Sequence, residues 1–489
     1  MSTHPDASVE QFGYKQQFDR TLRAFSSFAV GFSFISITSG IFTTFAFLLA
    51  TSGPRGLWMW IPAAIGQLLI TLIYAHFAAR IPLAGFSYQW ASRLAGPKVG
   101  WIFGWLSYAF LAVVVVATNY GFVTQALMPL LHIAPSLHVA EALTIAVAAI
   151  EAGVIIFSTK LAARINAAAV VTEIIGVAGL TIVLLVVALA GGKGDLSILT
   201  STGVVAGGPG YYGFNGPFML AVLLGAYTIV GFESIANLAE ETQNPTKVVP
   251  RAMIRATTAS GALGLLFLIA LCVAMPNVTD ISNSSTPITD IMQARLGSVV
   301  STIFLVIFVI SLFANSLVIM MSGSRMVFAM ARDKRFPASR LFSTVVRRTD
   351  SPIAATLLIF AGLVVIMLGV GNQTTALSNL FTAATILPAI IYLATVVLFA
   401  VTRNKLPEGD GVFTLGRIAP YVIGASLVWL AFELSALLLP DNFRTAVVIA
   451  AAVLGVGIVV FVGYLVFAPK ALSEEPGGVL NDVVPATPT

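Results

Sequence analysis

A series of apolar windows, each long enough to cross a bilayer, constrains this chain more than any other feature. About 20 predominantly apolar residues span the hydrocarbon once. Twelve windows of roughly that length occur, at 25–49, 57–80, 99–131, 137–158, 165–190, 217–238, 252–275, 297–325, 352–371, 377–401, 416–439 and 443–467. We therefore predict an all-α integral membrane protein with twelve transmembrane helices.

Composition agrees with this prediction and excludes a water-soluble globular protein. Apolar residues make up 58% of the chain and charged residues 10%, whereas soluble domains contain about 45–50% and about 25%. The net charge of +5 is small, and no basic stripe interleaved with aromatic residues occurs, so we expect no nucleic-acid partner. With a single cysteine, Cys272, and no catalytic set or phosphate-binding loop, we expect neither an enzyme nor a metal or cofactor site.

The basic residues predict the orientation of the spans, because cytoplasmic loops carry an excess of Lys and Arg. With the amino terminus inside, the outer loops hold only four of the 26 basic residues, namely Arg55, Lys193, Arg295 and Arg444. We therefore expect a multi-pass protein of the cell membrane with both termini in the cytoplasm. Residues 1–24 are predicted to form a polar tail, and residues 469–489 a disordered one, because they lack the apolar content to fold.

Two spans are interrupted by polar and small residues, whereas the others are smooth apolar runs. The first span carries SFISITSGI at Ser33–Ile41, and the sixth carries GAYTIVGFES at Gly225–Ser234. Small residues also allow close packing of membrane helices. However, paired interruptions in corresponding positions of two halves are typical of transporter sites formed by discontinuous helices, and the matched positions favour that interpretation.

The chemistry of two broken helices predicts the kind of solute. If the backbone unwinds around Thr38–Ile41, the N–H groups that open the second half-helix carry partial positive charge and suit a carboxylate. If the sixth span unwinds after Tyr227–Val230, the carbonyl groups that end its first half carry partial negative charge and suit an ammonium. A zwitterion such as an amino acid satisfies both sets.

Several motifs resemble one known group of transporters. They are Thr38–Ile41, Pro82–Trp90, Gly231–Ser234, Glu240–Pro245, Val249–Ala252 and Ser324–Asp333. From about Phe25 to Phe467 the chain resembles the amino acid-polyamine-organocation (APC) superfamily. Phe32–Phe34 and Asn215–Pro217 are most similar to its branch that contains gamma-aminobutyrate and choline permeases.

The resemblance implies a LeuT-like fold of five-plus-five inverted repeats with discontinuous helices 1 and 6. The ten-helix transport core would comprise residues 25–401, with repeats at about 25–190 and 217–401, and residues 402–468 would add helices 11 and 12. It also implies alternating access and transport driven by an ion gradient. The substrate-binding residues expected from the breaks and from family position are Thr38, Ser39, Gly40, Ile41, Asn119, Tyr227, Thr228, Val230 and Gly231.

One position departs from the family pattern. Some members place a Lys in the fifth helix, where its ammonium resembles a substitute for a sodium ion. Glu173 aligns with that position here. Coupling through a lysine therefore cannot be carried over to this chain.

Acidic residues in or near apolar spans are candidates for ion coupling, because a charge costs several kcal/mol there. A proton carrier must load and release its proton near neutral pH, as a carboxyl group in apolar surroundings can. We expect Glu233, beside the predicted site, as the first candidate and Glu173 as the second. A structural acid that caps the second half-helix is the alternative for Glu233, and Glu141 and Glu151 are expected to be packing or rim acids.

We therefore predict a secondary active transporter that imports an amino acid or related amine, with gamma-aminobutyrate among the candidates, by proton-coupled symport. An amino acid or amine exchanger and a sodium-coupled symporter remain alternatives, because they share every feature above. A channel or a receptor is a remoter alternative, since neither needs closure at the midplane. The partners expected are the substrate, a proton rather than sodium, and the lipid bilayer.

Overall fold

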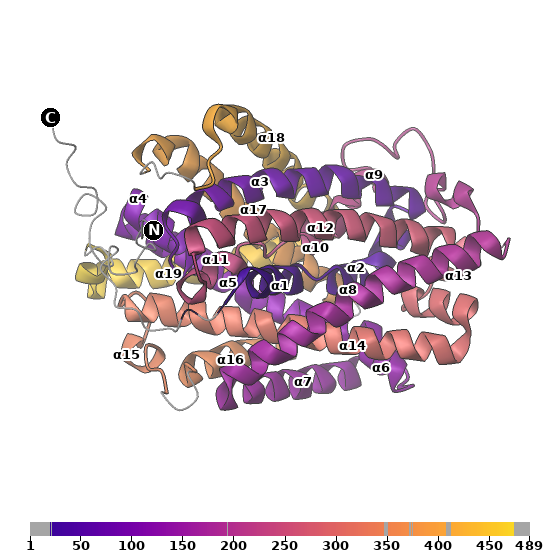
Figure 1. The fold of residues 1–489 in the computed structure, drawn as a ribbon, viewed down its shortest axis with the longest axis horizontal. Coiled ribbons are helices and arrows are strands. Elements are labelled where there is room, and N and C mark those ends of the chain that lie inside the picture. Colours follow the sequence, from indigo (N-terminus) through magenta and orange to yellow (C-terminus); the bar gives the residue numbers. More distant parts are fainter. Residues whose placement is uncertain are drawn as a thin grey trace, which may run out of the picture.

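The computed structural model describes residue 20 and residues 22–192, 194–346, 351–370, 373, 375–406 and 412–473. Over these residues it is helical, with isolated β-bridges and no strands (Figure 1). The longer helices are α1 (Ala24–Ile35), α2 (Ile37–Thr51), α3 (Trp60–Arg80), α5 (Pro97–Phe122), α7 (Leu137–Phe157), α8 (Thr159–Ala190), α12 (Pro245–Val273), α14 (Pro287–Arg332), α16 (Ile353–Val370), α17 (Ala376–Thr402), α18 (Ala419–Leu438) and α19 (Arg444–Phe467). The shorter ones are α4 (Phe86–Leu94), α6 (Met128–Leu130), α9 (Pro217–Leu220), α10 (Val222–Thr228), α11 (Ser234–Asn237), α13 (Val278–Ser282) and α15 (Ser339–Phe342).

Ten helical segments of the described chain are long and apolar enough to cross a membrane. Two shorter apolar segments, Pro217–Thr228 and Ile353–Gly369, coincide with the sixth and ninth windows. The prediction of an all-helical membrane protein is thus confirmed, whereas the twelve-span count and the inverted repeat stay predictions. Proline in the first turn starts α5, α12 and α14, where its missing N–H is not needed.

The broken first span lies in the middle of the bundle, and the last span lies at its edge. In the apolar window of Ala24–Thr51, 89% of the residues are buried, against 17% in that of Asp441–Phe467. In Figure 1, α1 and α2 lie between α12 and α14, while α18 lies at the upper edge of the bundle. The first span therefore has protein on all sides, which allows it to contain a non-helical residue.

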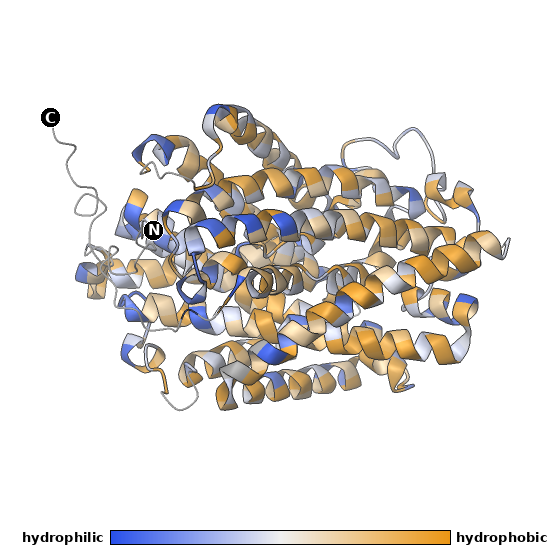
Figure 2. Cartoon of the chain, viewed as in Figure 1, coloured by the Kyte–Doolittle hydropathy of each residue, from blue (hydrophilic) through white to orange (hydrophobic). Residues whose placement is uncertain are grey.

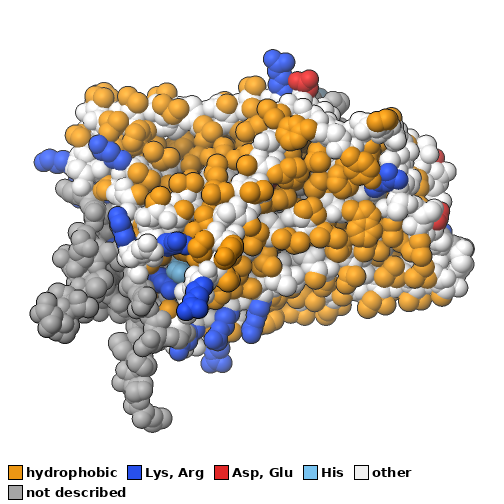
Figure 3. Space-filling model, turned by 90° about the horizontal axis from the view of Figure 1, so that it is seen from above, with side chains coloured by type: hydrophobic (Ala, Val, Ile, Leu, Met, Phe, Trp, Pro, Cys, Tyr) orange, Lys and Arg blue, Asp and Glu red, His pale blue; other side chains and the backbone are white. Residues whose placement is uncertain are grey.

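The surface is divided along the helices. The long helices are hydrophobic over most of their length and more hydrophilic toward the left end in Figure 2. Most Lys and Arg side chains visible in Figure 3 gather toward that same end, next to a broad hydrophobic surface. This division matches a membrane protein with its basic loops on one side.

The predicted tails fall mostly outside the described residues. Residues 1–19 and 21, and residues 474–489, are not described. Within the predicted carboxyl-terminal tail, Pro469–Leu472 forms a 3₁₀ turn in which Leu472 is buried. The Arg335 Nε donates a hydrogen bond of 3.1 Å to the carbonyl of Ala471, which fixes this turn to the bundle.

The orientation can be tested by cysteine labelling without removing the native cysteine. Cys272 is fully buried, so the unmodified protein should not react with a membrane-impermeant maleimide. Ser285 and Lys405 are exposed, and the predicted topology puts them on opposite sides of the membrane. We expect Ser285→Cys to be labelled in intact cells and Lys405→Cys only after lysis; the reverse pattern would contradict cytoplasmic termini.

Candidate functional site

The first span breaks at a single residue, Ser36. Its φ of +36° lies in a region that residues with a side chain rarely adopt. Its N–H donates to the carbonyl of Phe32, which ends α1, and its hydroxyl accepts from the N–H of Ser39, which caps α2. We expected the unwinding at Thr38–Ile41, and this was wrong: those residues form the first turns of α2, because Ser36 can cap the helix from outside it.

Glu173 occupies the amino end of α2. Its Oε1 accepts a hydrogen bond of 2.8 Å from the hydroxyl of Ser36 and one of 3.1 Å from the N–H of Thr38. The side chain comes from α8 and is buried. A carboxyl group at this position faces the positive end of the α2 dipole, so part of the end that we expected to receive a substrate carboxylate already has an acceptor from the protein.

Asn315 of α14 holds the carboxyl end of α1. Its Nδ2 donates to the carbonyls of Ser33 and Phe34, at 2.6 and 3.1 Å. These two carbonyls belong to the last turn of α1 and lack partners within the helix. Asn315 was not among the residues predicted from the sequence, although an amide in the middle of an apolar span is a signal that could have found it.

The sixth span is interrupted over Ile229–Glu233, between α10 and α11. The last bond of α10 joins the N–H of Ile229 to the carbonyl of Gly225. Gly231 has a φ of +100°, and a Cβ there would lie 1.8 Å from the ring of Phe34, so a larger residue does not fit. The expected break after Tyr227–Val230 therefore agrees with the geometry.

The carboxyl end of α10 offers unused acceptors. Over the described residues, no backbone or side-chain donor reaches the carbonyl oxygens of Ala226, Tyr227 and Thr228. The negative end of the α10 dipole lies at these carbonyls. This helix end is suited to a donor or a cation from outside the chain.

The two broken spans approach closely at Gly40 and Thr228. A Cβ on Gly40 would lie 2.2 Å from the Thr228 hydroxyl oxygen and 2.5 Å from its Cβ. Gly40 itself is helical, and its N–H donates to the carbonyl of Ser36. The glycine is thus needed for the contact between α2 and α10 and not for unwinding.

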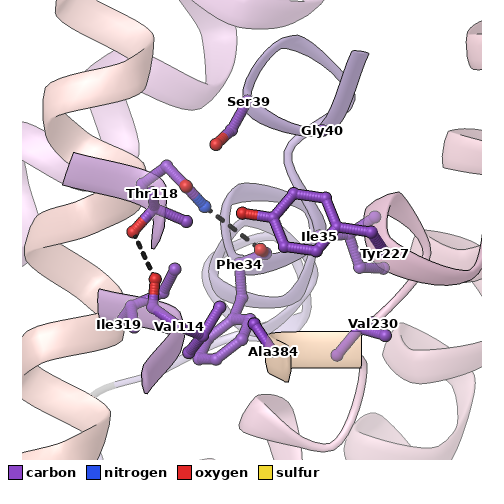
Figure 4. Close-up of a pocket in the computed structure, with 11 residues that line it drawn as sticks. Phe34, Ile35, Ser39, Gly40, Val114, Thr118, Tyr227, Val230, Ile319 and Ala384 are labelled. Atoms are coloured by element: carbon purple, nitrogen blue, oxygen red, sulfur yellow. Dashed lines mark hydrogen bonds between the residues drawn. The ribbon is translucent and has the colours of Figure 1, made fainter. Parts of the chain in front are cut away.

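A small cavity lies between the breaks (Figure 4). It has a volume of about 20 Å³, about enough for one water molecule. Four of the predicted substrate residues line it, namely Ser39, Gly40, Tyr227 and Val230, together with Phe34, Ile35, Val114, Thr118, Asn315, Ile319 and Ala384. Thr38, Ile41, Thr228 and Gly231 lie in the segments at the breaks but are not among its lining residues.

Two polar atoms at this cavity have no hydrogen-bond partner over the described chain. They are the hydroxyl of Tyr227 and the Oδ1 of Asn315, and both side chains are buried. Figure 4 shows the hydroxyls of Tyr227 and Ser39 pointing toward a common space. Leaving a buried polar group unpaired costs about 1–3 kcal/mol, so a water molecule or a ligand group that bonds to these atoms is favoured. The side chains that line the cavity are all uncharged.

Glu233 and Asn119 lie near this cavity but make other contacts. The Oε2 of Glu233 accepts a hydrogen bond of 2.9 Å from the hydroxyl of Tyr392, which also lies 3.4 Å from the N–H of Gly231. Asn119 donates to the Oε2 of Glu151 at 3.1 Å, and Ser316 donates to the other oxygen of that carboxyl. Glu151 therefore joins α5, α7 and α14 beside the cavity.

The sequence motifs of the loops meet at the end of the bundle that we expect to face the cytoplasm. The N–H groups of Ala84 and Gly85 donate to Glu240 Oε1 and Asn237 Oδ1, at 3.0 and 2.7 Å. Glu241 forms an ion pair with Arg325. Burial raises the pKa of Glu240 above its ordinary value, against the opposing effect of the nearby Arg332 guanidinium. These contacts join the segment after α3, the residues of and after α11, and α14 at this end of the bundle.

Comparison with known proteins identifies the group to which the chain is similar. A family described as "amino acid permease" matches residues 22–462. An uncharacterized amino-acid permease of Schizosaccharomyces pombe is 25% identical over 96% of this chain and 88% of its own length. Amino-acid permease 2 of Neurospora crassa is 24% identical over 95% and 86%, and amino-acid permease BAT1 of Arabidopsis thaliana is 25% identical over 86% of each chain.

The contact between the broken spans predicts a coupled effect on stability. Gly40→Ala should lower the free energy of unfolding by about 1–3 kcal/mol, because the added methyl group overpacks against Thr228. The double variant Gly40→Ala/Thr228→Gly should lose less than the sum of the single variants, with a coupling of at least about 0.5 kcal/mol. Thermal unfolding in detergent measures both.

Gly153→Ala is the matched control, because a Cβ at Gly153 meets nothing within 4 Å. It should unfold at the temperature of the unmodified protein or slightly above it, because alanine favours a helix more than glycine does. Additive losses in the Gly40 and Thr228 cycle would show that the two helices do not touch at this point.

Proposed function

Because the chain belongs to the amino acid permease family, we propose that it imports one zwitterionic amino acid together with one proton, across the cell membrane and by alternating access. The observation that carries this proposal is the pair of breaks that face one cavity. Discontinuous helices of this kind form substrate sites at the interface of inverted repeats. We accordingly propose twelve spans with a LeuT-like five-plus-five repeat.

The ammonium group of the substrate would bind at the carboxyl end of α10. The unused carbonyls of Ala226, Tyr227 and Thr228 and the α10 dipole both attract a cation. Asn315 Oδ1 adds an acceptor from α14. The uncharged lining suits a neutral side chain, so small neutral amino acids are the substrates proposed first, with gamma-aminobutyrate as a longer zwitterion to compare.

The carboxylate of the substrate would bind at the amino end of α2, which it must share with Glu173. Thr38 already donates its N–H to that carboxyl group. Two negative carboxyl groups at one helix end, away from water, repel each other strongly. A substrate carboxylate is therefore accepted when Glu173 carries a proton.

This sharing couples the proton to the substrate. Protonated Glu173 favours the substrate carboxylate, and by linkage the bound carboxylate favours the proton on Glu173. The pair would then move together, which is the requirement for symport. Glu173 becomes the first candidate for the carrier, because it bonds to the end of α2 that would receive the carboxylate, whereas Glu233 bonds to Tyr392. Neither carboxyl group is among the side chains that line the cavity.

A cavity of about 20 Å³ is too small for an amino acid. Its walls must therefore separate to admit one. On the expected cytoplasmic side, α11 is held by the N–H of Gly85, which donates to Asn237, and α1 by the Ser27 hydroxyl, which lies 3.3 Å from that of Thr242. Release of these contacts would open the path to that side. A transporter that opens to one side at a time has this requirement, whereas a channel does not.

A sodium-coupled symporter is the second candidate. The carboxyl of Glu173 and the hydroxyl of Ser36 lie together at the break, and such oxygen atoms are ligands that hard cations prefer. Uptake into liposomes with a proton gradient or with sodium distinguishes the two kinds of coupling.

Substrate affinity should depend on pH through Glu173. Above the pH at which Glu173 titrates, affinity in the unmodified protein should fall by up to about tenfold per pH unit. Glu173→Gln should bind with an affinity that is independent of pH, because its amide is neutral throughout. Ligand-induced thermal shift between about pH 5.5 and about pH 8 measures this, since a bound ligand raises apparent stability.

Glu433→Gln is the control for a buried carboxyl remote from the site. Glu433 is buried between α18 and α3, where its oxygens contact Gln67 Nε2 at 3.3 and 3.5 Å. This variant should keep the pH dependence of the unmodified protein. If Glu173→Gln keeps it as well, Glu173 is not the carrier, and Glu233→Gln is the variant to compare.

Uptake of labelled amino acids into liposomes tests the function itself. An inward proton gradient should drive accumulation without sodium and without substrate inside. Accumulation that needs sodium would favour the sodium symporter, and accumulation that needs preloaded substrate would favour an exchanger. Failure to transport any amino acid under all three conditions would contradict the proposed function.

A further inference from the structure

A second cavity lies at the cytoplasmic end of the bundle, between the start of α1 and the start of α12. Its volume is about 380 Å³, far larger than that of the cavity at the breaks. Its walls are formed by Ala24, Phe25, Phe28, Lys247, Val248, Arg251, Ala252 and Arg255. None of the contacts described above for the transport path uses these side chains.

Three basic side chains form one wall of this cavity. Lys247, Arg251 and Arg255 are four residues apart along α12 and so share one face of the helix. All three are exposed. Over the described residues, no ion pair is formed by any of them, so their charges attract an anion from outside this part of the chain.

The opposite wall is apolar. Phe25 and Phe28 lie in the first turns of α1, and Phe25 is 57% exposed. A wall of aromatic rings does not suit a free inorganic anion, which needs polar contacts all round. A ligand with an anionic head and an apolar body matches both walls.

The cavity also lies at the depth of lipid headgroups. Beyond Arg255, α12 contains no charged residue from Ala256 to Val273, so Arg255 marks the point at which the helix enters the hydrocarbon. Basic pockets between membrane helices on the cytoplasmic side suit anionic headgroups.

We propose that this cavity binds the phosphate group of an anionic phospholipid, with the acyl chains against Phe25 and Phe28. A lipid bound there contacts both α1 and α12 and so holds α1 closed against the bundle. Because α1 ends at the break at Ser36, the lipid would regulate the opening of the substrate site; this consequence rests on the proposed function, whereas the binding itself does not.

Binding of fluorescent phosphatidylglycerol to the purified full chain in neutral detergent tests the site. The triple variant Lys247→Gln/Arg251→Gln/Arg255→Gln should bind at least about tenfold more weakly than the unmodified protein, since each basic residue contributes to the attraction. A control with the same change of charge, Lys405→Gln/Arg417→Gln/Lys470→Gln, alters exposed residues outside the cavity and should bind normally. Equal binding by the first triple variant, or equal loss in the control, would overturn the proposal.

Two further experiments identify what occupies the cavity between α1 and α12. Inorganic phosphate should not displace the lipid; displacement at comparable concentration would mean a site for a soluble anion. The chain's own upstream residues Asp6, Glu10 and Asp19 are the other source of negative charge. Lipid binding that appears only in Asp6→Asn/Glu10→Gln/Asp19→Asn would mean that this segment occupies the cavity, against the proposal.

A separate assay tests whether the bound lipid regulates transport. In phosphatidylcholine vesicles with and without phosphatidylglycerol, the uptake rate of the unmodified protein should differ, and that of the Lys247 triple variant should not. Lipid binding as expected in a protein that transports no amino acid would leave the site standing and refute the proposed function. Normal transport without lipid binding would support the proposed function and refute the lipid site.

Discussion

The rest of this structure depends on hydrogen-bond partners for the backbone groups that the break in the first span exposes inside the membrane. Unpaired backbone groups cost several kcal/mol in a bilayer, and the break at Ser36 creates such groups on both sides. Ser36 and Glu173 accept from the N–H groups of α2, and Asn315 donates to the carbonyls of α1. Glu173 comes from α8 and Asn315 from α14, so the break fixes both helices around the cavity.

The class of fold and the position of the breaks were predictable, because a bilayer leaves few ways to satisfy a backbone. Apolar windows predicted the helices, and polar residues in the first and sixth spans predicted the interruptions. The exact residue of the first break was not predictable from composition. Gly40 was the natural candidate for unwinding, but its lack of a side chain serves the contact with Thr228, while Ser36 supplies the break.

The contacts of the site depend on pairing over long separations, which no local pattern encodes. Glu173 lies 137 residues from Ser36, and Asn315 lies 282 residues from Ser33. The sequence showed that Glu173 lies in an apolar span, but it could not show that its carboxyl group reaches the end of α2. Asn119 illustrates the same limit, since its neighbour Thr118 lines the cavity while Asn119 itself donates to Glu151.

Proton uptake on substrate binding is the most direct measure of whether Glu173 and the substrate carboxylate share the end of α2. Adding a saturating amino acid to the purified protein in weakly buffered solution, above the pH at which Glu173 titrates, should take up about one proton per molecule, and Glu173→Gln should take up none. Substrate binding without proton uptake, or uptake that persists in Glu173→Gln, would contradict this account.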